Sequence, residues 1–216
     1  MVYAWFMASQ LGLRERKKQQ VRQVIADTAE ALFAERGFEQ VTIAEIAQAA
    51  DVSKKTVFNY FPAKEDLYFD QDQAMEAGLI RAVRERRPGE SVLGACRRFY
   101  TDGLDQMAGQ EAAGPLTAHA RILAASPALQ ARQREIFHRQ EQSLAREIAA
   151  TTGATSDQLE PRIIAAAVLG AMRALWEQGL AQLASGRPHP SPATLRDDLD
   201  KAFGLLAGGL GDYGRT

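Results

Sequence analysis

Residues 42–67, TIAEIAQAADVSKKTVFNYFPAKEDL, carry the start and stop signals of two short helices joined by a three-residue turn. Thr42 followed by Glu45 fits a capping box, in which each side chain accepts a hydrogen bond from the other residue's backbone amide. Ser53 is a second N-cap residue, and Pro62 ends the second helix because proline disfavours a helical conformation in the residue before it. This spacing predicts a helix-turn-helix, which places its second helix in the major groove of DNA.

The second helix of this pair separates its side chains onto two faces. Val57 and Phe61 lie four residues apart, so both can face inward. The early and outer part of the helix carries the polar side chains Lys54, Lys55, Thr56 and Asn59. A helix that is polar outside and apolar inside is suited to reading DNA.

The same stretch resembles the TetR family of bacterial transcriptional regulators, whose N-terminal domain has three helices, the last two being the DNA-reading pair. The matching residues are Thr42, Ile46, Ala47, residues 50–53, Phe58, Tyr60, Phe61, Lys64 and Leu67. Two positions depart from the family pattern: Asp51 replaces the usual glycine, and Phe58 replaces the commoner tyrosine. Aspartate tolerates a left-handed backbone better than most residues, so we expect the turn to persist.

The resemblance implies roles for individual residues. Lys55, Thr56 and Asn59 are expected to affect base preference, whereas the matching family positions of Thr42, Tyr60 and Lys64 hold phosphates. The whole predicted DNA-binding set is Thr42, Ser53, Lys54, Lys55, Thr56, Phe58, Asn59, Tyr60 and Lys64. A twofold dimer is expected to read a palindromic operator.

Length and charge fit a small DNA-binding domain followed by a larger domain. The chain has 216 residues and a net charge of −1, with +2 on residues 1–64 and −3 on the remainder. We predict an N-terminal arm over residues 1–13, the helix-turn-helix domain over 14–63 and a ligand-binding and dimerisation domain over 64–216. The apolar start lacks a basic region and is too short to span a bilayer, so it is expected to be neither signal nor anchor. Met7 as the true start and a disordered arm are both open alternatives.

Apolar residues at helical spacing predict an all-α fold of about nine helices. The first helix, clear from Val21, ends at Gly37, and the fourth is expected to run unbroken from Lys64 to about Arg86. The remaining helices are predicted over residues 92–107, 115–125, 127–151, 157–183 and 192–206. No segment alternates with strand period.

The last two predicted helices indicate a homodimer. Residues 163–176 are nearly apolar all round, so this helix needs apolar neighbours on every side. The final helix offers a stripe formed by Leu195, Leu199, Ala202, Phe203 and Leu206. We predict that the eighth and ninth helices pair between two copies, as the TetR resemblance also implies. An interior helix in a monomer is the alternative.

Polar residues inside apolar helical patterns indicate a small-molecule pocket in the C-terminal domain. Arg173, for example, interrupts an apolar run where an unpaired charge would be costly. The candidate ligand-binding residues are Phe99, Tyr100, Met107, Arg121, Phe137, His138, Met172, Arg173 and Trp176. Each also allows a structural interpretation as core, ion pair or exposed edge. The expected effector is an apolar molecule with an acidic or polar end, a neutral lipophile being the alternative, and it is expected to act by displacing the fourth helix.

The sequence offers no support for an enzyme. It lacks G-x-S-x-G, a phosphate-binding glycine loop, H-E-x-x-H and paired cysteines, and it indicates no metal and no cofactor. The single cysteine, Cys96, has the spacing of a core residue and fits a reducing cytoplasm. The function predicted is a ligand-responsive transcriptional repressor with no membrane association. The alternatives are a small-molecule-binding or interaction protein that no longer reads DNA and, more distantly, a helical enzyme.

Overall fold

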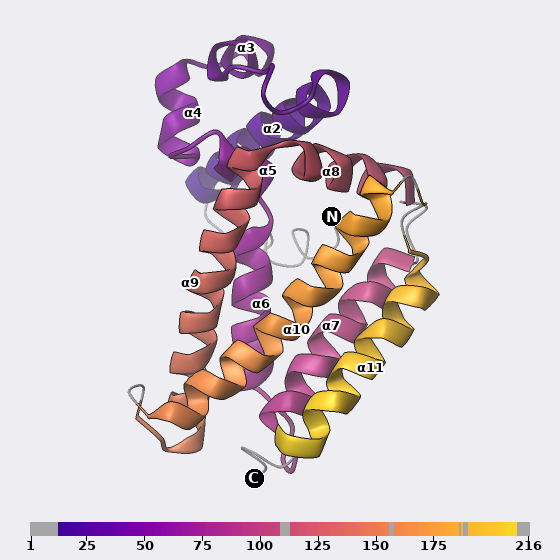
Figure 1. Ribbon diagram of the computed structural model, residues 1–216. Helices are drawn as coiled ribbons and strands as arrows, with labels where there is room; N and C mark the ends of the chain where they lie inside the picture. Colours follow the sequence, from indigo (N-terminus) through magenta and orange to yellow (C-terminus); the bar gives the residue numbers. More distant parts are fainter. Residues whose placement is uncertain (1–12, 109–112, 156–157, 186, 188–189, 211–216) are drawn as a thin grey trace. The chain divides into compact units, whose positions relative to one another are not determined.

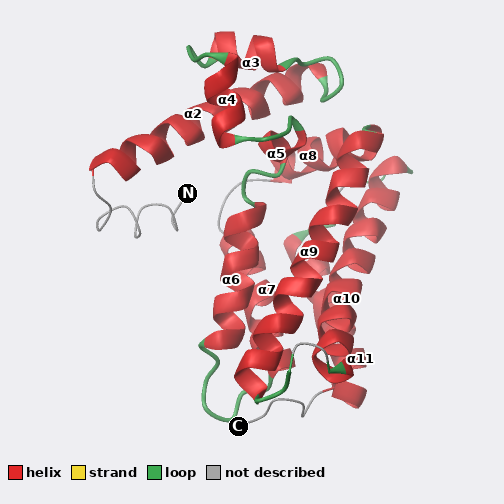
Figure 2. Ribbon diagram, turned by 90° about the vertical axis from the view of Figure 1, so that its left-hand side faces the viewer, coloured by secondary structure: helices red, strands yellow, loops and turns green. Residues whose placement is uncertain are grey.

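The computed structural model describes residues 13–108, 113–155, 158–185, 187 and 190–210, which form ten α-helices and contain no strand (Figure 2). This confirms the predicted all-α class. The predicted N-terminal arm lies almost wholly outside the described residues. The chain divides into two compact units, Met1–Asp70, here called the head, and Gln71–Thr216, here called the body. The division follows Asp70 rather than residue 63, because the short helix after Pro62 packs within the head.

The head contains α2 (Leu13–Arg36), α3 (Ile43–Ala49), α4 (Lys54–Tyr60) and α5 (Glu65–Tyr68) (Figure 1). Helix α2 packs on α3 and α5, and α3 packs on α4. The side chains buried between these helices include Ile25, Ala29, Phe33, Phe38, Val41, Ile46, Val57, Phe61 and Leu67. The predicted first helix is thus the brace of the helix-turn-helix, and Gly37 follows its end with a left-handed φ of 78°.

The body contains α6 (Asp72–Arg84), α7 (Val92–Ala108), α8 (Ala113–Ala125), α9 (Pro127–Thr152), α10 (Leu159–Ala184) and α11 (Pro192–Leu210). Helix α10 packs against α8, α9 and α11, and α7 packs between α6 and α11 (Figure 1). The predicted boundaries agree with these helices to within a few residues. At the ends of α9, Ser126 caps the first turn and Gly153 adopts a left-handed φ of 74°.

The unbroken fourth helix predicted from Lys64 to Arg86 is wrong. The chain instead forms α5 and α6, which are separated by residues 69–71. Leu67 is buried in the head, whereas Leu79 and Val83 belong to the core of the body. Helical spacing in the sequence cannot show that two consecutive apolar sets serve two different cores, because the repeat is the same in both.

Side-chain ion pairs join α6 to α9 at two levels. Arg139 contacts both Asp72 and Glu76, with 3.1 Å between its Nε and the Glu76 carboxylate. Farther along both helices, Arg84 donates two hydrogen bonds to Glu147, of 2.9 and 2.6 Å. Because the earlier residues of α6 pair with Arg139 and the later Arg84 pairs with the later Glu147, the two helices run parallel.

Helix α10 has an exposed side within a single chain. By length and composition alone, residues 159–182 form the one described helix that could cross a membrane. In the fold, Ile164 and Val168 are buried in the core of the body, whereas Leu159 and Ile163 are exposed. The predicted burial on every side is therefore not met by this chain's own helices.

The apolar stripe predicted on the last helix faces inward. Leu199 and Phe203 are only 3% and 2% exposed, respectively, and lie in the core of the body against α7 and α10, whereas Leu205 is 83% exposed. The prediction that Phe203 lies at a subunit interface is wrong, because α11 uses that face to close its own chain's core.

Candidate DNA interface

The start of α3 has the predicted capping box. The Glu45 amide donates to the Thr42 hydroxyl oxygen at 3.3 Å, and the Thr42 amide donates to the Glu45 carboxylate at 2.8 Å. The Thr42 hydroxyl also donates to this carboxylate, and Arg36 donates to its other oxygen at 2.7 Å. Chiefly through the hydrogen bond from the Thr42 side chain, the pKa of Glu45 is lowered to about 2. The hydroxyl proton of Thr42 is thus already committed within the head.

The turn between α3 and α4 keeps the conformation expected of a glycine. Asp51 has a φ of 51°, in the left-handed region. On either side of it, the amides of Ala50 and Val52 donate to the carbonyls of Ile46 and Ala47, each at 2.9 Å. The expectation that aspartate would preserve this turn is confirmed.

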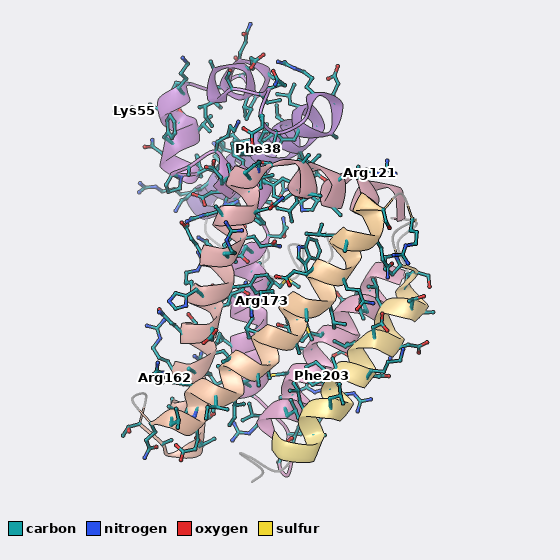
Figure 3. All side chains as sticks on the ribbon, viewed as in Figure 1. Phe38, Lys55, Arg121, Arg162, Arg173 and Phe203 are labelled. Atoms are coloured by element: carbon teal, nitrogen blue, oxygen red, sulfur yellow. The ribbon has the colours of Figure 1, made fainter. Side chains whose placement is uncertain are left out.

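Helix α4 is anchored by buried side chains and presents a polar outer face. Ser53 caps it by accepting a hydrogen bond from the Thr56 amide at 3.0 Å, as predicted. Val57 and Phe61 are 0% and 1% exposed, respectively. The exposed residues are Lys54, Lys55, Phe58 and Asn59, and Figure 3 shows Lys55 directed away from the head. The structure therefore brings the predicted base-reading residues onto one accessible surface.

Two hydroxyl groups at the start of α4 share a single hydrogen bond. Ser53 Oγ and Thr56 Oγ1 lie 2.8 Å apart, and either can donate to the other. One of the two hydroxyl protons is used in this contact, which leaves the other to donate elsewhere. The first turn of α4 thus offers a hydroxyl donor beside the ammonium groups of Lys54 and Lys55.

Lys64, predicted to hold a phosphate, is occupied inside the head. Its ammonium donates to the carbonyls of Phe38 and Val41 at 2.9 and 3.1 Å, and it lies 4.0 Å from the centre of the Phe38 ring. These contacts tie the start of α5 to the segment between α2 and α3. The sequence missed this role because the partners are backbone carbonyls more than 20 residues away.

Arg22 has a similar internal role that the sequence did not reveal. Its guanidinium stacks 4.3 Å from the centre of the Phe61 ring and donates to the carbonyl of Asp70 at 3.3 Å. In the structure it holds the end of α4 and the end of the head against α2.

Replacing Lys64 with methionine is expected to lower the free energy of unfolding by about 2–4 kcal/mol, because two charge-assisted hydrogen bonds and a cation–π contact are lost. Thermal unfolding followed by circular dichroism measures this. Lys54→Met is the matched control, since Lys54 is exposed and its replacement should change stability by less than about 0.5 kcal/mol. Equal melting temperatures for the two variants would show that the Lys64 contacts do not stabilise the head.

Several predicted ligand-binding residues pack around the core of the body. Those that lie against it are Phe99, Tyr100, Phe137 and Met172. The rings of Phe99 and Tyr100 are 5.2 Å apart, and burial raises the pKa of the Tyr100 hydroxyl. The side chain of Met107 lies outside the described residues. Cys96 is buried in the same core, and burial raises its pKa to about 12, so it is a packed thiol rather than a reactive one.

The polar members of the predicted pocket do not converge. Arg121, His138 and Arg173 are all exposed. His138 makes a 2.9 Å hydrogen bond with Gln142, and Arg173 lies 4.0 Å from Glu177 on the same helix. Figure 3 shows Arg121 and Arg173 on different helices. Arg173 thus fits the structural interpretation as an exposed edge, because its side chain reaches solvent.

Trp176 differs from these residues. Its indole Nε1 is the one buried side-chain polar atom, within the described part of the chain, that has no hydrogen-bond partner.

His119 on α8, which the sequence did not single out, has its pKa lowered to about 4 by burial, so it is neutral near pH 7. Among the described residues, no group of His, Cys, Asp and Glu side chains is placed to hold a metal ion.

Comparisons with known proteins agree with this architecture. Residues 25–70 match the family of bacterial regulatory proteins named for tetR, and residues 90–211 match the MftR C-terminal domain. The HTH-type transcriptional regulator TcmR of Streptomyces glaucescens is 31% identical over 160 residues, which cover 72% of this chain and 71% of that protein. A putative mycofactocin biosynthesis transcriptional regulator, MftR of Mycobacterium tuberculosis, is 24% identical over 191 residues, which cover 86% and 89% of the two chains.

A solved structure shows the same fold. NalD of Pseudomonas aeruginosa, the secondary repressor of the MexAB-OprM multidrug efflux pump, aligns with a TM-score of 0.53 at 18% identity and covers 88% of this chain and 96% of its own. The predicted assignment as a ligand-responsive, DNA-binding transcriptional regulator is confirmed by these matches. With its capped helix-turn-helix in the head and its helical body, the chain belongs to the TetR family of bacterial regulatory proteins.

Proposed function

We propose that this protein is a cytoplasmic repressor that binds a palindromic operator as a homodimer and releases it when an uncharged, largely apolar effector enters the body. The observation that carries the DNA-binding part is the accessible polar face of α4, which stands on the buried anchors Val57 and Phe61. A short helix anchored in this way can enter the major groove without rearranging its own core.

We assign separate roles to the residues of this face. Lys54 and Lys55 supply positive charge for the phosphates and the approach to the groove, which for Lys55 replaces the role in base preference expected from the resemblance. Asn59 reads a base edge. Phe58, 50% exposed, offers an apolar surface suited to a thymine methyl group rather than a hydroxyl contact. Ser53, Thr56 and Tyr60 contact the phosphate backbone or the nearest base. Thr42 is left out of this set, although it was predicted to hold a phosphate, because its hydroxyl and its amide both donate to Glu45. Lys64 stabilises the head, and any phosphate contact would use only its remaining donor.

The dimer is proposed to form through α10 and α11, the two helices predicted from the sequence. The contact is proposed to use their exposed side chains and not the inward-facing stripe that contains Leu199 and Phe203. Leu159, Ile163 and Leu205 are exposed to 63%, 47% and 83% in the single chain. Pairing these two helices with those of a second copy would bury these side chains in a four-helix contact. A twofold arrangement of this kind would present two heads to successive half-sites.

The effector is proposed to be uncharged because none of the ionisable residues predicted to line the pocket is placed to receive an anion in the interior of the body. Arg121 and Arg173 are exposed, and His119 is neutral near pH 7. Trp176 supplies an unused donor, which a carbonyl or ether oxygen of the effector would satisfy. The neutral alternative inferred from the sequence is thus favoured over an acidic ligand.

Coupling between the two sites is proposed to pass through α6. This helix begins two residues after the end of the head and is joined by ion pairs to α9. An effector that shifts α9 would therefore carry α6 with it. A coupling free energy of about 1–3 kcal/mol would weaken operator binding roughly 5- to 150-fold.

The experiment that tests the proposed function is selection of bound fragments from the genomic DNA of the source organism, followed by a salt titration. We expect a palindromic site whose affinity falls steeply with salt, as counterion release requires. A protein that enriched no sequence, or bound every fragment equally, would instead be the interaction protein that no longer reads DNA.

Replacing Trp176 with phenylalanine is expected to raise about five- to tenfold the concentration of an uncharged hydrogen-bond acceptor that is needed to release the operator. The reason is the loss of one hydrogen bond of roughly 1 kcal/mol. The probe is 2-acetylnaphthalene, and its effect is read from the anisotropy of labelled operator DNA. The anion 2-naphthoate is the matched control and is expected to release less DNA from the unmodified protein. Stronger release by 2-naphthoate would contradict the uncharged effector. Without either probe, the Trp176→Phe variant and the unmodified protein should bind the operator with the same affinity.

A further inference from the structure

An open groove of about 830 Å³ lies between α6 and α9, and it contains none of the predicted ligand-binding residues. Its charged lining consists of Glu76, Arg81, Arg84, Arg139, Arg146 and Glu147. Four arginines therefore face two glutamates, on a body whose acidic and basic residues are balanced in number. Figures 1 and 2 show the two helices that form the walls of this groove.

Both glutamates of the groove are already paired. Glu147 is only 9% exposed and receives two hydrogen bonds from Arg84. Glu76 pairs with Arg139, which also contacts Asp72. Each glutamate already accepts hydrogen bonds from a guanidinium group, so it has little capacity left to neutralise another cation.

Arg81 and Arg146 remain without an acidic partner among the residues the structure describes. Arg146 donates to the hydroxyl of Ser143 at 3.2 Å, and both arginines are exposed. Two positive charges that share one concave surface raise the local concentration of anions. The planar donor fork of arginine also matches the oxygens of carboxylates and phosphates.

The register of the two helices brings these arginines to nearly the same level. Glu76 and Arg139 are 63 residues apart in the sequence, and so are Arg84 and Glu147. By the same offset, Arg81 is level with residue 144, two positions before Arg146, which is about 3 Å along a helix. The two guanidinium groups thus come from opposite walls, between the two ion-paired levels. The short side chains of Ala77 and Ser143 leave this stretch of the groove unfilled.

We propose that this groove binds a small dianion, a molecule carrying two carboxylates or a phosphorylated group, between Arg81 and Arg146. Such a ligand would bridge α6 and α9 and add a third ionic link to the two that the chain already makes. The site is separate from the interior effector site of the proposed function. Binding here would hold whether or not the protein reads DNA.

The test is calorimetric titration of the full-length protein with inorganic pyrophosphate and, separately, with succinate, at constant ionic strength. We expect saturable binding of at least one probe, and at least a tenfold loss of affinity, a change of about 1.4 kcal/mol, in Arg81→Gln/Arg146→Gln. Preference for pyrophosphate would identify a phosphoryl ligand, and preference for succinate a dicarboxylate. The control variant Arg121→Gln/Arg134→Gln removes the same charge from exposed arginines outside the groove.

Three results would overturn the proposal. The first is that neither probe binds saturably at about 10 mM, which corresponds to a binding free energy of less than roughly 3 kcal/mol. The second is that the groove variant and the unmodified protein bind the probes with equal affinity. The third is that the control variant loses as much affinity as the groove variant. Circular dichroism of the groove variant should match that of the unmodified protein, because neither arginine holds a buried partner. If its fold were changed, the single variants Arg81→Gln and Arg146→Gln would be titrated in the same way, each with an expected loss of at least threefold.

Discussion

Replacing Phe203 with glutamate is expected to lower the free energy of unfolding of the body by at least about 4 kcal/mol, because it places a carboxylate in a packed core and removes an aromatic ring. Phe203 is 2% exposed and lies 6.4 Å from the Tyr100 ring, centre to centre. Since a typical domain is stable by only about 5–15 kcal/mol, this loss should appear as a large fall in the melting temperature measured by circular dichroism.

The companion variant Leu205→Glu distinguishes a core position from an interface position. Leu205 is 83% exposed in the single chain, so the variant should keep its helical content. If α10 and α11 form the proposed dimer contact, sedimentation should show monomers at micromolar concentration. A folded, dimeric Leu205→Glu protein with normal operator binding would move the interface away from this end of α11. A Phe203→Glu protein as stable as the unmodified protein would contradict the observed packing of that helix.

Reversing the charge of Lys54 and Lys55 together is expected to weaken operator binding by about 10²–10³-fold and to flatten its salt dependence by roughly one to two units, because phosphate contacts are lost. Both side chains are exposed on α4, and neither takes part in the buried anchors of the helix, so the head should remain folded. Fluorescence anisotropy with labelled operator at several salt concentrations measures both effects. Arg134→Glu, an exposed charge reversal on α9, is the control and should leave affinity nearly unchanged.

Asn59→Ala should behave differently from the lysine variant. Losing a base contact is expected to cost about 1–3 kcal/mol on the preferred operator and little on unrelated DNA, with the salt slope preserved. If the lysine and asparagine variants lost the same affinity on every sequence, the proposed division between phosphate contacts and base reading would be wrong.

The sequence alone determined the features of this protein that depend on neighbouring residues. The capping box of Thr42 and Glu45, the Ser53 cap and the left-handed Asp51 were predicted and are observed. So were the starts of the long helices at Pro127 and at Pro192. These signals are readable because hydrogen bonds at helix ends join residues three or four apart, so the residue types and their spacing suffice.

Only the tertiary structure decided which side chains are buried and which distant groups they contact. Phe203 and Leu205 are two residues apart on one helix, yet one is core and the other exposed. Lys64 meets carbonyls more than 20 residues away, and Arg139 meets carboxylates more than 60 residues away. An apolar stripe or a positive charge has the same sequence signature whether its partner is its own core, a second copy, DNA or a distant helix. The choice among them depends on how distant segments pack, which local spacing does not encode.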